Sequence, residues 1–123
     1  MDMTEYDLDM LDDAGFDTEQ GLMYSADDEE IYFECLQTYA DSCEAKLSDL
    51  SASYDAADWK KYGVLVHAIK SNSKTIGLSA MYEKALALEN AAGREDEAFI
   101  RAEHNGLAEE YRRMAGIIRG AEL

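Results

Sequence analysis

His67 stands at the centre of a run of residues whose types and spacing could do chemistry, WKKYGVLVHAIKSNSKTIGL (59–78). Lys70, Ser71 and Lys74 follow it at positions i+3, i+4 and i+7, so on a helix they lie near the imidazole. Neutral imidazole is nucleophilic near physiological pH, lysines offset an anion, and a serine hydroxyl can donate a hydrogen bond. These residue types favour a histidine nucleophile beside an anion-binding surface.

A helix is needed to hold these residues, and the spacing predicts one over 59–76. Its apolar stripe would contain Trp59, Tyr62, Val66, Ile69, Ser73 and Ile76. The opposite side would carry Lys60, Val64, His67, Ser71 and Lys74, with Lys70 at the edge. A structural histidine would belong to the apolar stripe, so His67 is predicted to face outward. Gly63, four residues before His67, is costly inside a helix and is therefore predicted to serve a contact beside the ring.

A wider pattern is in register with His67. The pattern consists of Lys70, a small residue at Ser71, then Gly77, Met81, Ala85 and Leu88-Glu89. It resembles the signature of histidine-containing phosphotransfer (HPt) domains. The run Asp27–Tyr32 into Leu36 and Tyr39, and Asp58-Trp59, also fit that family, so the resemblance covers most of the chain. One departure is Ser71, which stands where the family usually has glycine.

The resemblance implies that His67 accepts a phosphoryl group from a receiver-domain aspartyl phosphate and passes it to another receiver aspartate. Lys70 and Lys74 would offset the phosphoryl charge, and Ser71 could donate a hydrogen bond to it. Gly63 and Val64 would belong to the docking face. By the same resemblance, the partners are response-regulator receiver domains and a hybrid histidine kinase. The receiver would supply Mg²⁺ and the catalysis, and this chain would bind no cofactor.

Two alternatives remain open. The first is a helical adaptor that no longer accepts phosphate and only binds a receiver or kinase, which Ser71 leaves open and the pairing of His67 with Lys70 disfavours. The second is an enzyme with His67 as general base, but the sequence offers no partner acid, nucleotide-binding glycine loop or metal constellation. His104 lacks comparable neighbours and is predicted to be an ordinary surface residue. Gln37 and Glu83 are candidates for orienting the His67 ring from neighbouring helices.

The net charge of the chain limits which classes of molecule are expected as partners. The 123 residues carry a formal net charge of −16 with a pI near 4.2. Such a chain repels phosphate backbones and anionic lipid headgroups, so neither nucleic acid nor membrane is expected as a partner. Within this acidic chain Lys60 and Lys61 join Lys70 and Lys74 near His67, which favours a local anion. With no signal-peptide or membrane-spanning segment, and with Cys35 and Cys43 read as reduced buried residues, a cytoplasmic monomer is expected.

The pattern predicts an all-α fold in a single domain. Met3, Tyr6, Met10 and Leu11 indicate a short N-terminal helix, and 18–23 could add a further turn. We expect 1–24 to form a helical lid and 25–123 to form an antiparallel up-down-up-down four-helix bundle. Its first helix is predicted to start at Ser25 or Asp27 and to run to Tyr54 without a break, because the chain has no proline. The other three helices are predicted to span 59–76, 78–93 and 95–119. The presence of Met1 and of a complete bundle favours a freestanding protein.

Overall fold

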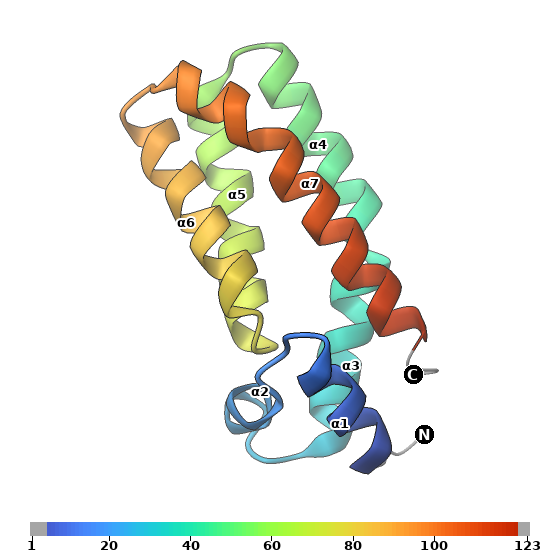
Figure 1. Ribbon diagram of the computed structural model, residues 1–123. Coiled ribbons are helices and arrows are strands. Elements are labelled where there is room, and N and C mark those ends of the chain that lie inside the picture. Colours follow the sequence, from blue (N-terminus) through green and yellow to red (C-terminus); the bar gives the residue numbers. More distant parts are fainter. Residues whose placement is uncertain (1–4, 121–123) are drawn as a thin grey trace.

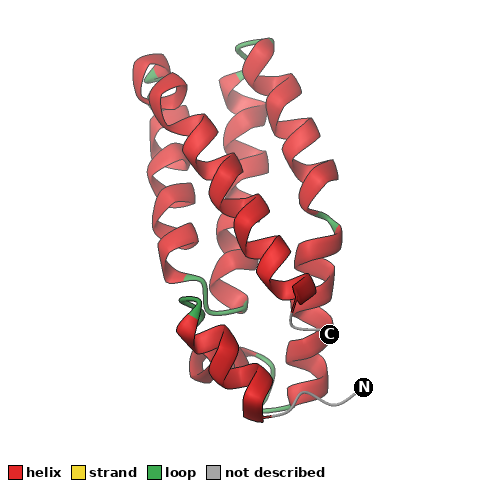
Figure 2. Cartoon of the chain, turned by 45° about the vertical axis from the view of Figure 1, so that its right-hand side comes forward, coloured by secondary structure: helices red, strands yellow, loops and turns green. Residues whose placement is uncertain are grey.

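The computed structural model describes residues 5–120, which are helical throughout apart from short connections and contain no strand (Figure 1, Figure 2). The helices are α1 (Glu5–Asp13), α2 (Thr18–Tyr24), α3 (Glu29–Asp41), α4 (Cys43–Asp55), α5 (Trp59–Thr75), α6 (Ser79–Gly93) and α7 (Glu97–Gly120). The all-α prediction is therefore confirmed. Met3, which we expected in the first helix, lies outside the described residues.

Aspartate side chains set the start of four helices. Asp17, Asp28, Asp58 and Asp96 accept hydrogen bonds from backbone N–H groups in the first turns of α2, α3, α5 and α7. Asp58 thereby caps the helix that carries His67. The cap of α3 is Asp28, whereas Ser25 and Asp27 were the expected candidates. Asp27 has φ +57° and belongs to the turn before the helix.

Five helices end at a residue in the left-handed backbone region. These residues are Gly15, Ala26, Ala57, Gly77 and Glu95. The N–H of the next residue then bonds to a carbonyl five positions back, as Asp58 does to Ser53 at 2.9 Å. The left-handed conformation costs a non-glycine residue roughly 1 kcal/mol, which applies to Ala26, Ala57 and Glu95. At Glu95 it also delays the start of the last helix to Glu97, two residues beyond the prediction.

The predicted long helix is broken at Ser42, so the expectation of an unbroken helix is wrong. α3 ends at Asp41 and α4 begins at Cys43. The Ser42 hydroxyl donates to the carbonyl of Thr38 at 2.8 Å, and this carbonyl also accepts the Ser42 N–H at 3.0 Å. Serine side chains that bond back in this way bend helices without any proline. The absence of proline was therefore insufficient evidence for continuity.

The side of α3 that faces the core also differs from the expected one. Ile31 recurs at helical spacing with Cys35 and Tyr39, which predicts burial, yet 44% of it is exposed. The adjoining positions Tyr32, Leu36 and Ala40 are buried. The buried positions of α3 continue into Cys43, Leu47 and Leu50 of α4 at intervals of three or four residues.

Consecutive helices pack side by side around one core. α5 lies between α4 and α6, and α7 contacts α6, α3 and α4 (Figure 1). The largest fully buried side chains come from every one of these helices; they are Tyr32, Leu36, Leu47, Leu50, Tyr62, Ile69, Met81, Leu88, Ile100 and Tyr111. This packing leaves one face of α5 free for solvent.

The N-terminal helices α1 and α2 lie at one end of the molecule, next to the turn between α5 and α6 (Figure 1). The Asp17 N–H donates to the Gly77 carbonyl at 2.7 Å, and the Tyr32 hydroxyl donates to the Ile76 carbonyl at 3.0 Å. Gly77 has φ +83°, and a Cβ there would collide with the Asp17 backbone. Gly21 lies against the Tyr32 ring in the same way. These contacts attach the N-terminal segment firmly to α3 and α5.

Gly106 and Gly116 do not mark close packing. A Cβ at either position would meet no atom within 4 Å. Inside α7 each of these glycines therefore weakens the helix by about 1 kcal/mol relative to alanine.

The cysteines are both free, as expected. Cys43 is buried, and this burial raises the pKa of its thiol to about 11, whereas Cys35 is only half-buried. The prediction that both are buried therefore holds for Cys43 alone.

Candidate functional site

His67 projects from the free face of α5. The apolar stripe predicted for this helix is buried, as Trp59, Tyr62, Val66, Ile69 and Ser73 all face the interior. The His67 side chain is 57% exposed, which confirms the outward orientation. A rigid helix, buried along one side, therefore presents this imidazole to solvent.

Glu89 on α6 joins His67 and Lys70 into one network. Its Oε2 lies 2.5 Å from His67 Nδ1, and its Oε1 accepts a hydrogen bond from Lys70 Nζ at 2.7 Å. Partial burial alone would raise the pKa of Glu89, but the hydrogen bonds from Lys70 and His67 outweigh it and lower that pKa below its ordinary value. The Glu89 carboxylate is thus ionised at neutral pH and bonds to both the Lys70 ammonium group and the His67 ring.

This network determines which ring nitrogen of His67 can act as a nucleophile. An ionised carboxylate can only accept a hydrogen bond, so Nδ1 must carry the proton. In the neutral ring Nε2 then holds the lone pair. Glu89 also holds the ring in a fixed orientation, as carboxylates do for functional histidines elsewhere. The site therefore offers an oriented imidazole with a nucleophilic Nε2.

An open hollow lies beside the imidazole between α5 and α6. Its lining residues are Trp59, Lys60, Gly63, Val64, His67, Glu89, Ala92 and Gly93. A Cβ on Gly63 would lie 3.4 Å from the Ala92 Cβ, so this glycine permits the close approach of the two helices as well as the space beside the ring. Val64 is 66% exposed and adds an apolar element to the surface around His67.

The remaining predicted site residues lie on the same helix but at different distances from the network. Ser71 is exposed, and its side chain makes no hydrogen bond within the described part of the chain. Lys74 is exposed and its Nζ lies 5.5 Å from the centroid of the Tyr82 ring on α6. Of the four clustered lysines, only Lys70 is tied to His67 through Glu89, and Lys60 shares the hollow with it.

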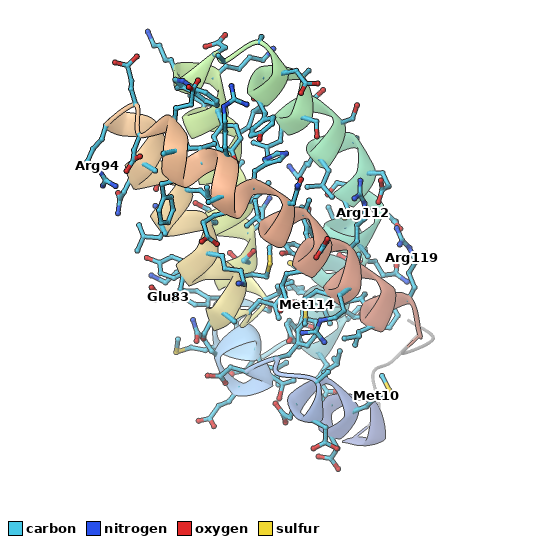
Figure 3. The ribbon with its side chains drawn as sticks, turned by 45° about the horizontal axis from the view of Figure 1, so that its top comes forward. Met10, Glu83, Arg94, Arg112, Met114 and Arg119 are labelled. Carbon is cyan, nitrogen blue, oxygen red and sulfur yellow. The ribbon has the colours of Figure 1, made fainter. Side chains whose placement is uncertain are left out.

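The residues expected to orient the ring, Gln37 and Glu83, are the wrong ones. Glu83 (Figure 3) lines a depression between α6 and α7 with Phe99 and Glu103, on a different side of α6 from Glu89. Gln37 belongs to α3, and Glu89 occupies the Nδ1 position instead.

A sequence signal for Glu89 did exist. In an antiparallel helix pair, residues equally far from the turn face each other, and His67 and Glu89 lie ten and twelve residues from Gly77.

His104 is not a surface residue, which corrects the prediction made for it. It is only 5% exposed; its Nδ1 lies 3.0 Å from the Tyr62 hydroxyl and its ring stacks on Tyr54 at 4.1 Å. Its position between Ile100 and Leu107 places it on the buried stripe of α7. A neutral imidazole tolerates this environment because Tyr62 satisfies one ring nitrogen, and burial lowers the pKa of His104.

Two further features bear on the kind of site. Among the side chains that the structure describes, those of residues 8–120, no group of three or more His, Cys, Asp or Glu is arranged to hold a metal ion. None of the described helices combines the length and the apolar character needed to cross a membrane.

Comparison with known proteins identifies the family of this chain. The family model of the Hpt domain matches residues 34–116, about two thirds of the chain, and this range contains His67, Lys70 and Glu89. Neither the curated proteins nor the solved structures give a significant match. Hpt domains are phosphocarrier modules that generally lack catalytic activity of their own. On the extent of this match and on its helical fold, the chain belongs to the Hpt domain family.

Proposed function

We propose that this protein carries a phosphoryl group on Nε2 of His67 between the aspartates of receiver domains in a multistep phosphorelay. The observation that carries the proposal is the network of His67, Glu89 and Lys70 on an exposed helix face in a chain of the Hpt family. It supplies the three things that a carrier needs: an oriented nucleophile, a cation for the incoming charge, and access for a partner.

The transfer step requires little of this chain. The Nε2 lone pair attacks the phosphorus of a receiver acyl phosphate, the P–N bond forms, and the bond from phosphorus to the aspartate oxygen breaks with the electron pair leaving on the carboxylate. The proton on Nδ1 remains hydrogen-bonded to Glu89, whose negative charge balances the positive charge that develops on the ring. Transfer onward to the next aspartate reverses these bond changes.

Lys70 has a second role in this scheme. A phosphoryl group brings about two negative charges into a strongly acidic protein. Lys70 is on the same helix surface, one turn from His67, so its Nζ can interact with a phosphoryl oxygen while Glu89 remains within reach. Ser71 and Lys74 extend this surface, and either could contact the phosphoryl group or the partner.

The docking face would be the exposed surface of α5 around His67. Val64 contributes exposed apolar area, and Gly63 keeps the hollow beside the ring open, as small transient interfaces require. The receiver would provide Mg²⁺ and the catalytic groups, and a hybrid histidine kinase would carry the donor receiver. This chain would act as a cytoplasmic monomer without a cofactor.

The framework we propose for this function is a single domain. Residues 25–123 would form an antiparallel up-down-up-down bundle in which α3 and α4 together make the first helix, and 1–24 would cover one end. The short connections between α4, α5, α6 and α7, and the contacts of α2 with α3 and α5, support this division.

A phosphotransfer assay tests the function directly. Wild type and a His67→Gln variant are incubated with a Mg²⁺-loaded, phosphorylated receiver, and His104→Gln serves as the matched control at the other histidine. We expect acid-labile, base-stable label on wild type and on His104→Gln, and none on His67→Gln.

Label on His67→Gln would show that His67 is the wrong residue. No label on any of the three proteins, across several receivers, together with retained receiver binding would support the adaptor that Ser71 leaves open.

A further inference from the structure

The net charge of this protein is concentrated in one part of the chain. The first 45 residues contain fifteen Asp or Glu and no Lys or Arg. The other 78 residues contain twelve acidic and eleven basic residues, so they are close to neutral. The segment that carries the charge comprises α1, α2 and α3, at the end of the molecule next to the turn between α5 and α6 (Figure 1).

Part of this acidity has a structural explanation and part does not. Asp17 and Asp28 cap helices, and Glu44 pairs with Arg112 on α7 at 3.0 Å. The carboxylates of α2, α3 and the turn between them that have neither an ion pair nor a side-chain hydrogen bond within residues 8–120 are Glu19, Asp27, Glu29, Glu30, Glu34 and Asp41. All six are exposed, and their mutual repulsion opposes folding.

Exposed apolar side chains lie among these carboxylates. Met23, Tyr24 and Ile31, which we call the α2–α3 patch, are 60%, 47% and 44% exposed. Only one other large apolar residue within the described chain is similarly exposed, and this is Val64 beside His67. The phosphotransfer site accounts for the exposure of Val64, but it does not account for the exposure of the α2–α3 patch.

The surface around the patch is hollowed in two places. Met23 lies in a depression that it shares with Asp17, Glu19, Gln20 and Asp27. Ile31 lies at a groove between α3 and α5, whose lining also includes Glu34 and Ile76.

The backbone beneath the patch is held by hydrogen bonds. Asp17 bonds to Gly77, and the Asp27 N–H donates to the Leu22 carbonyl at 2.7 Å. A surface preformed in this way loses little conformational entropy when a partner binds.

We propose that the α2–α3 patch and its carboxylates form a docking surface for a cationic amphipathic helix of another protein. An amphipathic helix would place its apolar side chains on Met23, Tyr24 and Ile31, as helices do in grooves of this kind. Its Lys or Arg side chains would meet Glu19, Glu30 and Glu34 and relieve their repulsion. The inference is independent of the phosphotransfer function, because it uses neither His67 nor Glu89.

The sign of the charge selects this occupant. Nucleic acid and anionic lipid surfaces are repelled by the same carboxylates. In a second copy of the chain the arginines of α7 are engaged, since Arg112 and Arg113 pair with Glu44 and Glu110 and Arg119 donates to the Ala40 carbonyl. The exposed lysines of α5 belong to the face that carries His67. A cationic amphipathic segment satisfies both the charge and the apolar area.

The test uses a synthetic amidated helix-forming peptide of Lys and Leu, with Leu at helical spacing on one face, titrated into the ¹⁵N-labelled full chain. A scrambled peptide of the same composition, with Leu distributed around the helix, controls for charge alone. We expect saturable binding with amide shifts confined to residues 17–35 and to the end of α5. Binding should be at least about tenfold tighter than for the scrambled peptide and should weaken as salt rises.

Two sets of variants locate the interaction. Met23→Ser with Ile31→Ser should weaken binding at least about tenfold while leaving phosphotransfer from a receiver intact. The triple variant Glu29→Gln, Glu30→Gln and Glu34→Gln should weaken binding more than Glu83→Gln, Glu103→Gln and Glu109→Gln. The second triple removes the same number of exposed, unpaired carboxylates from α6 and α7.

Several results would overturn the proposal. Equal affinity for the scrambled peptide, or equal effects of the two triple variants, would mean that the acidic segment serves solubility only. Shifts centred on Val64 and His67 would mean that the peptide binds the phosphotransfer face. A dimer of the free protein whose interface covers Met23 would assign the patch to a second copy.

Discussion

The two histidines of this protein occupy opposite environments. His67 is exposed on α5 and bonded to the ionised Glu89, whereas His104 is buried on α7, stacked on Tyr54 and bonded to the Tyr62 hydroxyl. A carboxylate at Nδ1 stabilises a positive ring, and burial among aromatic rings disfavours one. The same residue type is thereby prepared for chemistry in one place and for packing in the other. Variants that alter one environment at a time test this contrast.

The largest effect is expected from Glu89→Ala. This change removes the group that orients His67 and balances its charge, so the phosphotransfer rate should fall about 100-fold, equivalent to roughly 2.7 kcal/mol of activation free energy. Rapid-quench kinetics with a phosphorylated receiver measure it. Glu89→Gln, which retains a hydrogen-bond acceptor without the charge, should lose less. If Glu89→Ala transferred phosphate at the wild-type rate, the proposed role of the network would be wrong.

The next effect concerns the buried histidine. His104→Ala leaves a cavity beside Tyr54 and removes the partner of the buried Tyr62 hydroxyl, so the free energy of unfolding should fall by about 2 kcal/mol. Urea denaturation followed by circular dichroism measures the loss. Under conditions in which the variant remains folded, its phosphotransfer rate should match wild type. A rate loss comparable with that of Glu89→Ala would show that His104 also contributes to phosphotransfer, which would contradict the functional difference between the two histidines.

A smaller effect should follow from Tyr62→Phe. The ring stays in the core, but His104 Nδ1 loses its partner, so we expect a loss of roughly 1 kcal/mol in the free energy of unfolding. The double variant with His104→Ala separates the hydrogen bond from ring packing. If the two losses simply add, the bond between Tyr62 and His104 contributes nothing measurable.

The smallest effect is a difference in pH dependence. Because the pKa of His104 is lowered in the folded state, the unfolded chain binds a proton near pH 6.5 that the folded chain does not. Stability should therefore fall as the pH drops through this range, and His104→Gln should flatten that fall. Glu89 acts in a separate window: its folded pKa lies below the ordinary 4.5, so its contribution is present above that value and is lost in more acidic solution. Denaturation series at several pH values would contradict the assignment if His104→Gln and wild type declined in parallel.

The sequence predicted the framework of the site better than its details. The apolar stripe of α5 and the outward orientation of His67 followed from the 3.6-residue period alone, since that period decides which side chains can face a common core. The family resemblance is confirmed over residues 34–116. The roles of Lys70, Ser71, Lys74, Gly63 and Val64 remain predictions.

Three features required the tertiary structure. The break at Ser42 occurs where a serine hydroxyl bonds back to the Thr38 carbonyl, and no proline in the sequence indicates it. His104 lies on a stripe that is apolar at its other positions, and its burial is decided by Tyr62, which is 42 residues away in sequence. Glu89 reaches His67 only because α5 and α6 pack against each other.

The sequence by itself therefore determined the buried face of α5 and the exposure of His67, because burial along a regular helix follows from local periodicity. The tertiary structure decided which polar side chains meet across helices. A hydrogen bond requires atoms about 3 Å apart, and such proximity between distant residues depends on how the helices pack.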